Sequence, residues 1–208
     1  MECEKAFPQL RLPICDTCGC PDAMIKAAHA CDDCPPGRIH LSKARAAVPF
    51  VGVGQTIVEK LKYGGHLNYA AYMADRMGRT AAQEYEGVLF DSIIPVPLHA
   101  VRRRERGFNQ SEVLAAHLAE TLGVPLLLDA LRRSRPTPSQ TKLNKKQRRQ
   151  NIKDAFAPGG PSPALANTVL LVDDVYTTGA TMNECARVLV ASGQAKTVYC
   201  LAFARACL

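Results

Sequence analysis

An apolar run ends in two acids and a tight turn at VLLVDDVYTTGAT, residues 169–181. The run Thr168–Val175 is rich in branched apolar residues and is typical of a buried strand. Apolar side chains then recur at helical spacing over Ala180–Val190. A buried strand that turns directly into a helix predicts an α/β fold, and ligands bind where such strands end.

The rest of the chain continues this alternation. Helices are expected at 55–63, 67–85 and 109–122, strands at 88–96, 125–131 and 197–203, and a charged loop at 98–108. The predicted fold class is therefore α/β, with a mainly parallel sheet flanked by helices. We expect this domain to span 49–208 and a separate cysteine- and proline-rich module to span 1–48.

Two Cys-x-x-Cys turns lie in this first module. They place Cys15 with Cys18 and Cys31 with Cys34, and two such turns can bring four thiolates to one tetrahedral point. The pattern predicts a structural zinc site without an open position for a substrate. Reduced cysteines without a ligand, or an oxidised pair, are the alternatives.

The charge of the chain favours anionic partners. Its formal net charge is +7, which suits phosphates, nucleotides or nucleic acid but says nothing of the fold. No apolar run approaches the ~18 residues of a membrane helix. The first residues contain acids and a proline, so a secretory signal is not expected and the predicted location is cytoplasmic.

The turn has the chemistry of a ribose 5-phosphate site. The first amides of a helix bind phosphate, threonine hydroxyls add donors, and a glycine allows close approach of the backbone. Ionised acids accept hydrogen bonds from two adjacent sugar hydroxyls, which explains carboxylates beside a phosphate cradle. The predicted ligand-binding residues are Asp173, Asp174, Thr177, Thr178, Gly179, Ala180 and Thr181.

This string resembles the phosphoribosyl pyrophosphate (PRPP) loop of type I phosphoribosyltransferases. The resemblance extends to IIPVPLHAVRRRERGFNQSEVLA, QTKLNKKQRRQNIKDAF, IVEKLKYGG and the paired Cys-x-x-Cys turns, which together are similar to the ComF competence-protein family. It implies a type I phosphoribosyltransferase fold, an N-terminal zinc module and a cytosolic role in natural transformation, with single-stranded DNA or DNA-uptake proteins as partners. It also suggests a homodimer.

The resemblance implies PRPP bound with magnesium, and two basic regions are candidates to meet it. The loop after the strand at 88–96 offers pyrophosphate-binding candidates at Arg102, Arg103, Arg104 and Arg106. The acid-free region 132–153 fits a flap over the pyrophosphate, a nucleic-acid contact or a charged surface helix, with candidates Lys142, Lys145, Lys146, Arg148 and Arg149.

One residue departs from the purine-salvage relatives of this fold. They carry an acid at the position of Thr177 that can take a proton from the base, and threonine cannot do this.

Three hypotheses for the function stay open: a phosphoribosyltransferase with an unknown acceptor, a non-catalytic sensor of PRPP or a nucleotide, and a single-stranded-DNA adaptor.

Overall fold

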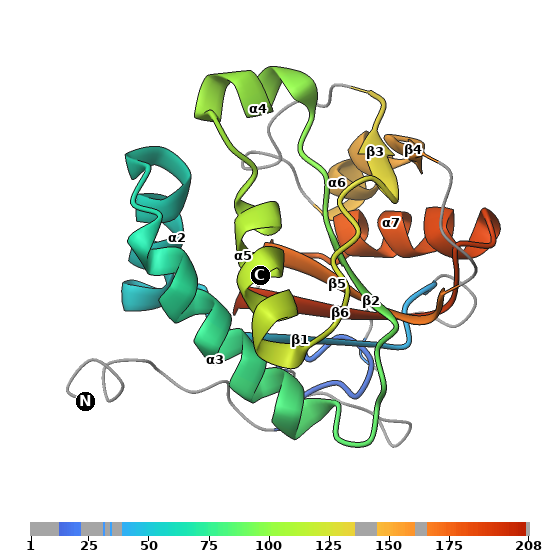
Figure 1. Ribbon diagram of the computed structural model, residues 1–208, viewed down its shortest axis with the longest axis horizontal. Coiled ribbons are helices and arrows are strands. Elements are labelled where there is room, and N and C mark those ends of the chain that lie inside the picture. The colour runs from blue at the N-terminus through green and yellow to red at the C-terminus, as the bar shows by residue number, and fades with distance from the viewer. Residues whose placement is uncertain are drawn as a thin grey trace.

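A parallel sheet forms the centre of the molecule. The computed structural model describes residues 13–21, 31, 34, 39–135, 145–160 and 166–206 (Figure 1). Four strands follow the order β1-β6-β5-β2, and all three pairings are parallel. Their bounds are β1 Lys43–Pro49, β2 Ser92–Pro95, β5 Ala166–Tyr176 and β6 Ala195–Arg205. The prediction of a mainly parallel sheet flanked by helices is confirmed.

Helices cover both faces of this sheet. One face packs against α2 (Gly52–Gly64), α3 (Asn68–Glu84) and α5 (Gln110–Leu122), which lie together in Figure 1. The other face carries α7 (Ala180–Ala191) and, beside it, the four cysteines of the first module. The central strands β5 and β6 are thereby covered on both faces, as their largely apolar sequences require.

Local signals set the ends of the helix that matters most for the site. Asn109 precedes α5, and its side chain accepts a hydrogen bond from the amide of Ser111, as expected of an N-cap. Gly123 ends α5 in the left-handed conformation. None of the helices in the described ranges is long and apolar enough to cross a lipid bilayer.

Two expectations about local structure are wrong. The segment 98–108 contains a helix, α4 (Ala100–Arg106), because alanine, arginine and glutamate all favour helix, and the chain stops at the left-handed Gly107. In the predicted strand at 125–131, residues 125–130 form a single bridge, between Ile93 and Leu126. The strand there is β3 (Leu131–Arg133), which pairs antiparallel with β4 (Phe156–Pro158).

Strand β1 joins the cysteine turns to the sheet. The predicted boundary between residues 48 and 49 lies inside this strand, which pairs with β6 from Lys43↔Tyr199 to Pro49↔Arg205. The amide of Ala44 donates to the carbonyl of Thr17 at 2.6 Å, directly beside the first Cys-x-x-Cys turn. The four cysteines of the cluster, all of which the structure describes, therefore pack against the sheet.

Candidate functional site

The two acids of the turn lie at the end of β5, and the start of α5 holds them. The hydroxyl of Ser111 donates to Asp173 Oδ1 at 2.7 Å. Gln110 Nε2 lies 3.5 Å from Asp174 Oδ1. Both α5 residues are buried, and α5 is anchored because Asn109 Nδ2 donates to the carbonyl of Val96 at 3.1 Å. Two neutral donors of α5 thus hold the carboxylates in place.

A lysine from a distant part of the chain neutralises the inner acid. Asp174 is 3% exposed, and its Oδ2 lies 2.5 Å from Nζ of Lys62, near the end of α2. The helix ends here because Gly65 adopts the left-handed conformation. A cation already sits against the carboxylate pair, so this position suits positive charge.

Crowding of two carboxylates changes the proton affinity of the outer acid. Burial, and next the charge of Asp174, raise the pKa of Asp173 to about 7, although the Ser111 hydroxyl and Lys62 act in the opposite direction. Asp173 in the free protein therefore keeps its proton to a higher pH than an exposed aspartate does. A ligand that brings hydroxyl donors or a cation would favour the ionised form.

This shift predicts how stability depends on pH. An unfolded aspartate ionises near pH ~4, so between that value and about pH 7 the folded chain holds a proton that the unfolded chain has lost. Asp173 therefore costs stability progressively as pH rises through this window. We expect Asp173→Asn to raise the melting temperature at pH 7.5 and to flatten its pH dependence, as measured by calorimetry. Asp75→Asn, which removes an exposed acid, should change neither; equal effects of both variants would refute the assignment.

The turn after β5 is built around an aromatic ring. Gly179 has φ +73° and directly precedes α7, and a Cβ at this position would lie 2.2 Å from the hydroxyl oxygen of Tyr176. Only glycine fits there. The hydroxyl of buried Thr178 accepts a weak hydrogen bond from the amide of Ala180 at 3.4 Å. Thr177, Thr178 and Thr181 thus surround the start of a helix, as the sequence predicts.

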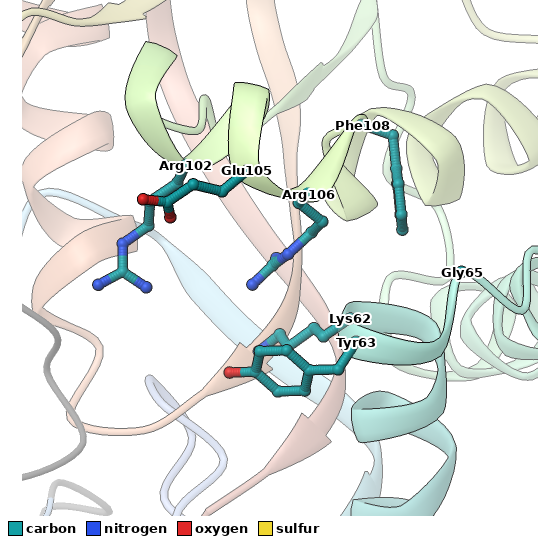
Figure 2. Close-up of a pocket in the computed structure, with 7 residues that line it drawn as sticks. All are labelled: Lys62, Tyr63, Gly65, Arg102, Glu105, Arg106 and Phe108. Atoms are coloured by element: carbon teal, nitrogen blue, oxygen red, sulfur yellow. The ribbon is translucent and has the colours of Figure 1, made fainter.

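A pocket of about 280 Å³ opens beside Lys62 (Figure 2). The end of α2 and helix α4 face each other across it, and Arg106 points from α4 toward α2. Its lining residues are Lys62, Tyr63, Gly65, Arg102, Glu105, Arg106 and Phe108. Arg102 and Arg106 outnumber the one acid of the lining, and Lys62 adds a charge that it shares with Asp174, so this pocket suits an anion.

Arg106 links this pocket to the acids. Its guanidinium lies 5.5 Å from the ring centroid of Tyr63 and donates to Oε1 of Gln110, whose amide nitrogen faces Asp174. Lys62 makes the second link, because it lines the pocket and pairs with Asp174. An anion in the pocket and a ligand on the carboxylates would therefore share the same supporting side chains.

Helix α4 divides the four candidate arginines into two pairs. Arg102 and Arg106 line the pocket. Arg103 turns away and pairs with Glu112 at 2.6 Å, and Arg104 is exposed outside the pocket lining. Helical geometry separates the pairs, because residues four apart share one face.

The four predicted metal ligands come together. Cys15, Cys18, Cys31 and Cys34 are buried, and their sulfur atoms all lie within 4.8 Å of one another. Burial raises the pKa of the Cys15 thiol, but the backbone amides of Cys18, Cys31 and Thr17 outweigh burial and lower it overall. These amides favour the thiolate form of Cys15, and four sulfurs at this separation can hold a metal ion.

The basic candidates of 132–153 are only partly described. Lys142 lies outside the described residues. Helix α6 (Lys145–Ile152) contains Lys145, Lys146, Arg148 and Arg149, and only its backbone is described at these four positions.

Comparison with known proteins places the chain in a family. A DNA utilization protein, YhgH, of Salmonella typhimurium is 34% identical over 210 residues, covering 96% of this chain and 87% of that protein. Competence protein F of Haemophilus influenzae is 39% identical over 112 residues, which cover 53% of this chain and only 49% of that protein. The chain belongs to the ComF family. The family model described as phosphoribosyl transferase domain matches residues 109–206.

Among solved structures, adenine phosphoribosyltransferase from Saccharomyces cerevisiae has a TM-score of 0.39 and 16% identity, covering 68% of this chain and 69% of that one. This is a much weaker likeness than that to the ComF relatives.

Three residues of the site were not predicted from the sequence. Lys62 belongs to IVEKLKYGG, and Gln110 and Ser111 belong to RGFNQSEVLA, two segments that carry the family resemblance but no site pattern of their own. Their contacts join positions 62 to 112 residues apart, which helical spacing cannot reveal.

Proposed function

We propose that this ComF protein binds PRPP with magnesium and transfers its phosphoribosyl group to an acceptor in the service of natural transformation. The observation that carries the proposal is the joint placement of two carboxylates, a glycine turn at a helix start and a basic pocket. PRPP carries ribose hydroxyls, a 5-phosphate and a pyrophosphate, which correspond to these three features. The proposed compartment is the cytoplasm.

Each part of the ligand has suitable partners. The carboxylates of Asp173 and Asp174 accept hydrogen bonds from the ribose hydroxyls. The first amides of α7 and the hydroxyls of Thr177, Thr178 and Thr181 bind the 5-phosphate. Arg102, Arg106 and Lys62 then neutralise the pyrophosphate in the adjoining pocket.

Transfer requires mainly orientation and charge stabilisation. The acceptor attacks the anomeric carbon of the ribose while the bond to the pyrophosphate oxygen breaks, and the pyrophosphate leaves with the bonding electrons. Positive charge develops on the sugar, and negative charge on the leaving group, where Arg102 and Arg106 can stabilise it. Thr177 cannot remove a proton from the acceptor, so the acceptor must be nucleophilic without a base at that position.

The carboxylate pair also suits a magnesium ion. Magnesium prefers oxygen ligands and keeps several waters, and it is commonly held through one or two carboxylates plus substrate phosphates. Asp173 and Asp174 supply such oxygens, and the ammonium group of Lys62, 2.5 Å from Asp174, supports positive charge at this position. When bound, magnesium would neutralise pyrophosphate charge and support its departure.

A non-catalytic role is the second candidate. The protein would sense PRPP or a nucleotide, or handle single-stranded DNA, without transfer. Threonine at position 177 in place of an acid favours this view, and so does α6, whose sequence KKQRRQNI has basic residues and no acid. Pyrophosphate release in the presence of candidate acceptors separates the two roles, because only the enzyme forms pyrophosphate.

The pocket assignment predicts unequal effects for neighbouring arginines. Arg106→Ala should weaken PRPP·Mg²⁺ binding by roughly 10- to 100-fold, because it removes one charge-assisted contact of ~1.5–3 kcal/mol. Arg104→Ala, on the same short helix, should leave binding within about twofold, since its exposed charge is screened by solvent. Isothermal titration calorimetry measures both affinities.

Ribose 5-phosphate provides the internal control for this pair. It lacks the pyrophosphate, so its binding should not distinguish Arg106→Ala from the unaltered protein. Equal losses of PRPP affinity in both arginine variants would reject the pocket as the pyrophosphate site. No binding of PRPP at millimolar concentration would reject the proposed function.

A further inference from the structure

A buried arginine connects the cysteine cluster to the turn after β5. Arg205 ends β6 and is 3% exposed. Its Nη1 donates to the carbonyl of Thr177 and lies 3.4 Å from that of Tyr176. Its Nη2 faces the sulfur of Cys18 at 3.8 Å. One guanidinium therefore contacts a predicted metal ligand and the backbone of the predicted phosphate-binding turn.

A cysteine sulfur, and not a carboxylate, lies beside the guanidinium of Arg205. Among the described residues, no Asp or Glu forms an ion pair with it. A buried guanidinium without a negative partner is costly, and arginine does not lose its proton in proteins. Four thiolates around a divalent metal keep an excess of negative charge, which Arg205 would meet through Cys18.

The contact continues to the start of α7. The guanidinium carbon of Arg205 lies 4.4 Å from the ring centroid of Tyr176, which is a cation–π distance. The hydroxyl of the same ring occupies the space that any Cβ at Gly179 would need. The position of Arg205 thus affects the ring, and the ring determines where Gly179 and the first amides of α7 can lie.

We propose that Arg205 is a positioning residue that couples metal binding at the four cysteines to anion binding at the turn 177–181. A filled metal site holds the guanidinium by charge. The guanidinium then fixes two carbonyls and the Tyr176 ring, so the amides of the turn are arranged before a ligand arrives. Coupling between two sites is reciprocal, so a ligand at the turn must strengthen metal binding by the same factor.

The first test measures zinc affinity by chelator competition, with and without PRPP·Mg²⁺. In the unaltered protein, PRPP should raise zinc affinity by about 5- to 150-fold, the common range for coupled sites. Arg205→Met keeps apolar bulk but loses the charge and donors, so the factor should fall to about one. Arg205→Lys restores the positive charge but lacks the planar guanidinium with its several donors. It should therefore recover only part of the effect of PRPP on zinc affinity.

Arg45→Met is the matched control. Arg45 is equally buried and donates to the carbonyls of Cys15 and Asp16, but its other side-chain partners are Glu84 and the carbonyl of Ala44, not the turn. This variant can weaken zinc binding, yet the coupling factor should stay. If loss of zinc simply unfolded the chain, the two sites would be coupled in every variant. A coupling factor in Arg205→Met equal to that of the unaltered protein would therefore overturn the proposal.

A second measurement does not depend on the proposed function. Amide hydrogen exchange of residues 177–181 should accelerate at least ~10-fold when zinc is chelated, while amides of Val169–Val172 in β5 serve as an internal reference. Unchanged exchange in the turn after zinc has left contradicts the coupling. If PRPP fails to bind at all, the proposed function is rejected, and this exchange result still decides whether metal at the cysteines orders the turn.

Discussion

Replacing Asp174 with Asn is expected to weaken PRPP·Mg²⁺ binding by roughly 100- to 1000-fold. The buried carboxylate would accept hydrogen bonds from ribose hydroxyls, and contacts of this charged kind contribute ~1.5–3 kcal/mol each. Asparagine keeps the shape but offers one acceptor oxygen and no charge. It also leaves Lys62 without the carboxylate that now lies 2.5 Å away. Calorimetric titration with PRPP·Mg²⁺ gives the affinity.

Asp75→Asn is the matched control for this variant. Asp75 makes an exposed pair with Arg79 on α3, so the same chemical change there should leave PRPP affinity unaltered. A thermal unfolding scan of each variant separates loss of binding from loss of structure. Near-normal PRPP affinity in folded Asp174→Asn would contradict the assignment of the ribose site.

Replacing Cys31 with Ser is expected to have the largest effect on stability. Structural zinc contributes ~10–16 kcal/mol of binding free energy that is also folding free energy. Loss of one thiolate should reduce zinc content well below one ion per chain and lower the melting temperature by at least ~10 °C, since ~1 kcal/mol corresponds to ~2–4 °C at this size. Elemental analysis and calorimetry measure the two effects.

Cys185→Ser provides the comparison. Cys185 is fully buried on α7 but does not belong to the four-cysteine cluster, so its replacement should reduce stability while zinc content stays at one. Full zinc content in Cys31→Ser would mean that another residue completes the site. Absence of any metal in protein never exposed to chelator would refute the proposed zinc site.

The strand-turn-helix at the centre of the site was predictable because its signals are local. In VLLVDDVYTTGAT an apolar run is followed by two acids, a glycine and the start of a helical pattern. These segments form β5, the turn and α7 in the structure. The cysteine cluster was predictable for the same reason, because the spacing within each turn already limits where the sulfurs point. Contacts between segments far apart in the chain could not be predicted from the sequence.

The missed features depend on partners far away in the chain. Strand β1 reads KARAAVP, whose small and basic residues lack a clear strand pattern, and it forms because β6 offers a parallel edge. Helix α4 has charged residues on every side and so no periodic apolar stripe. The ion pair of Lys62 with Asp174 and the bridge made by Arg205 follow from the fold alone.

The pairing of β1 with β6 also sets an order of events during synthesis. Lys43 pairs with Tyr199, so a ribosome adding about 5–20 residues per second needs roughly ten seconds or more between the two strands. The cysteine turns are therefore synthesised long before β6, which ends in Arg205. Their thiols must meet metal, or stay reduced, while the nascent chain still lacks the sheet face against which they pack.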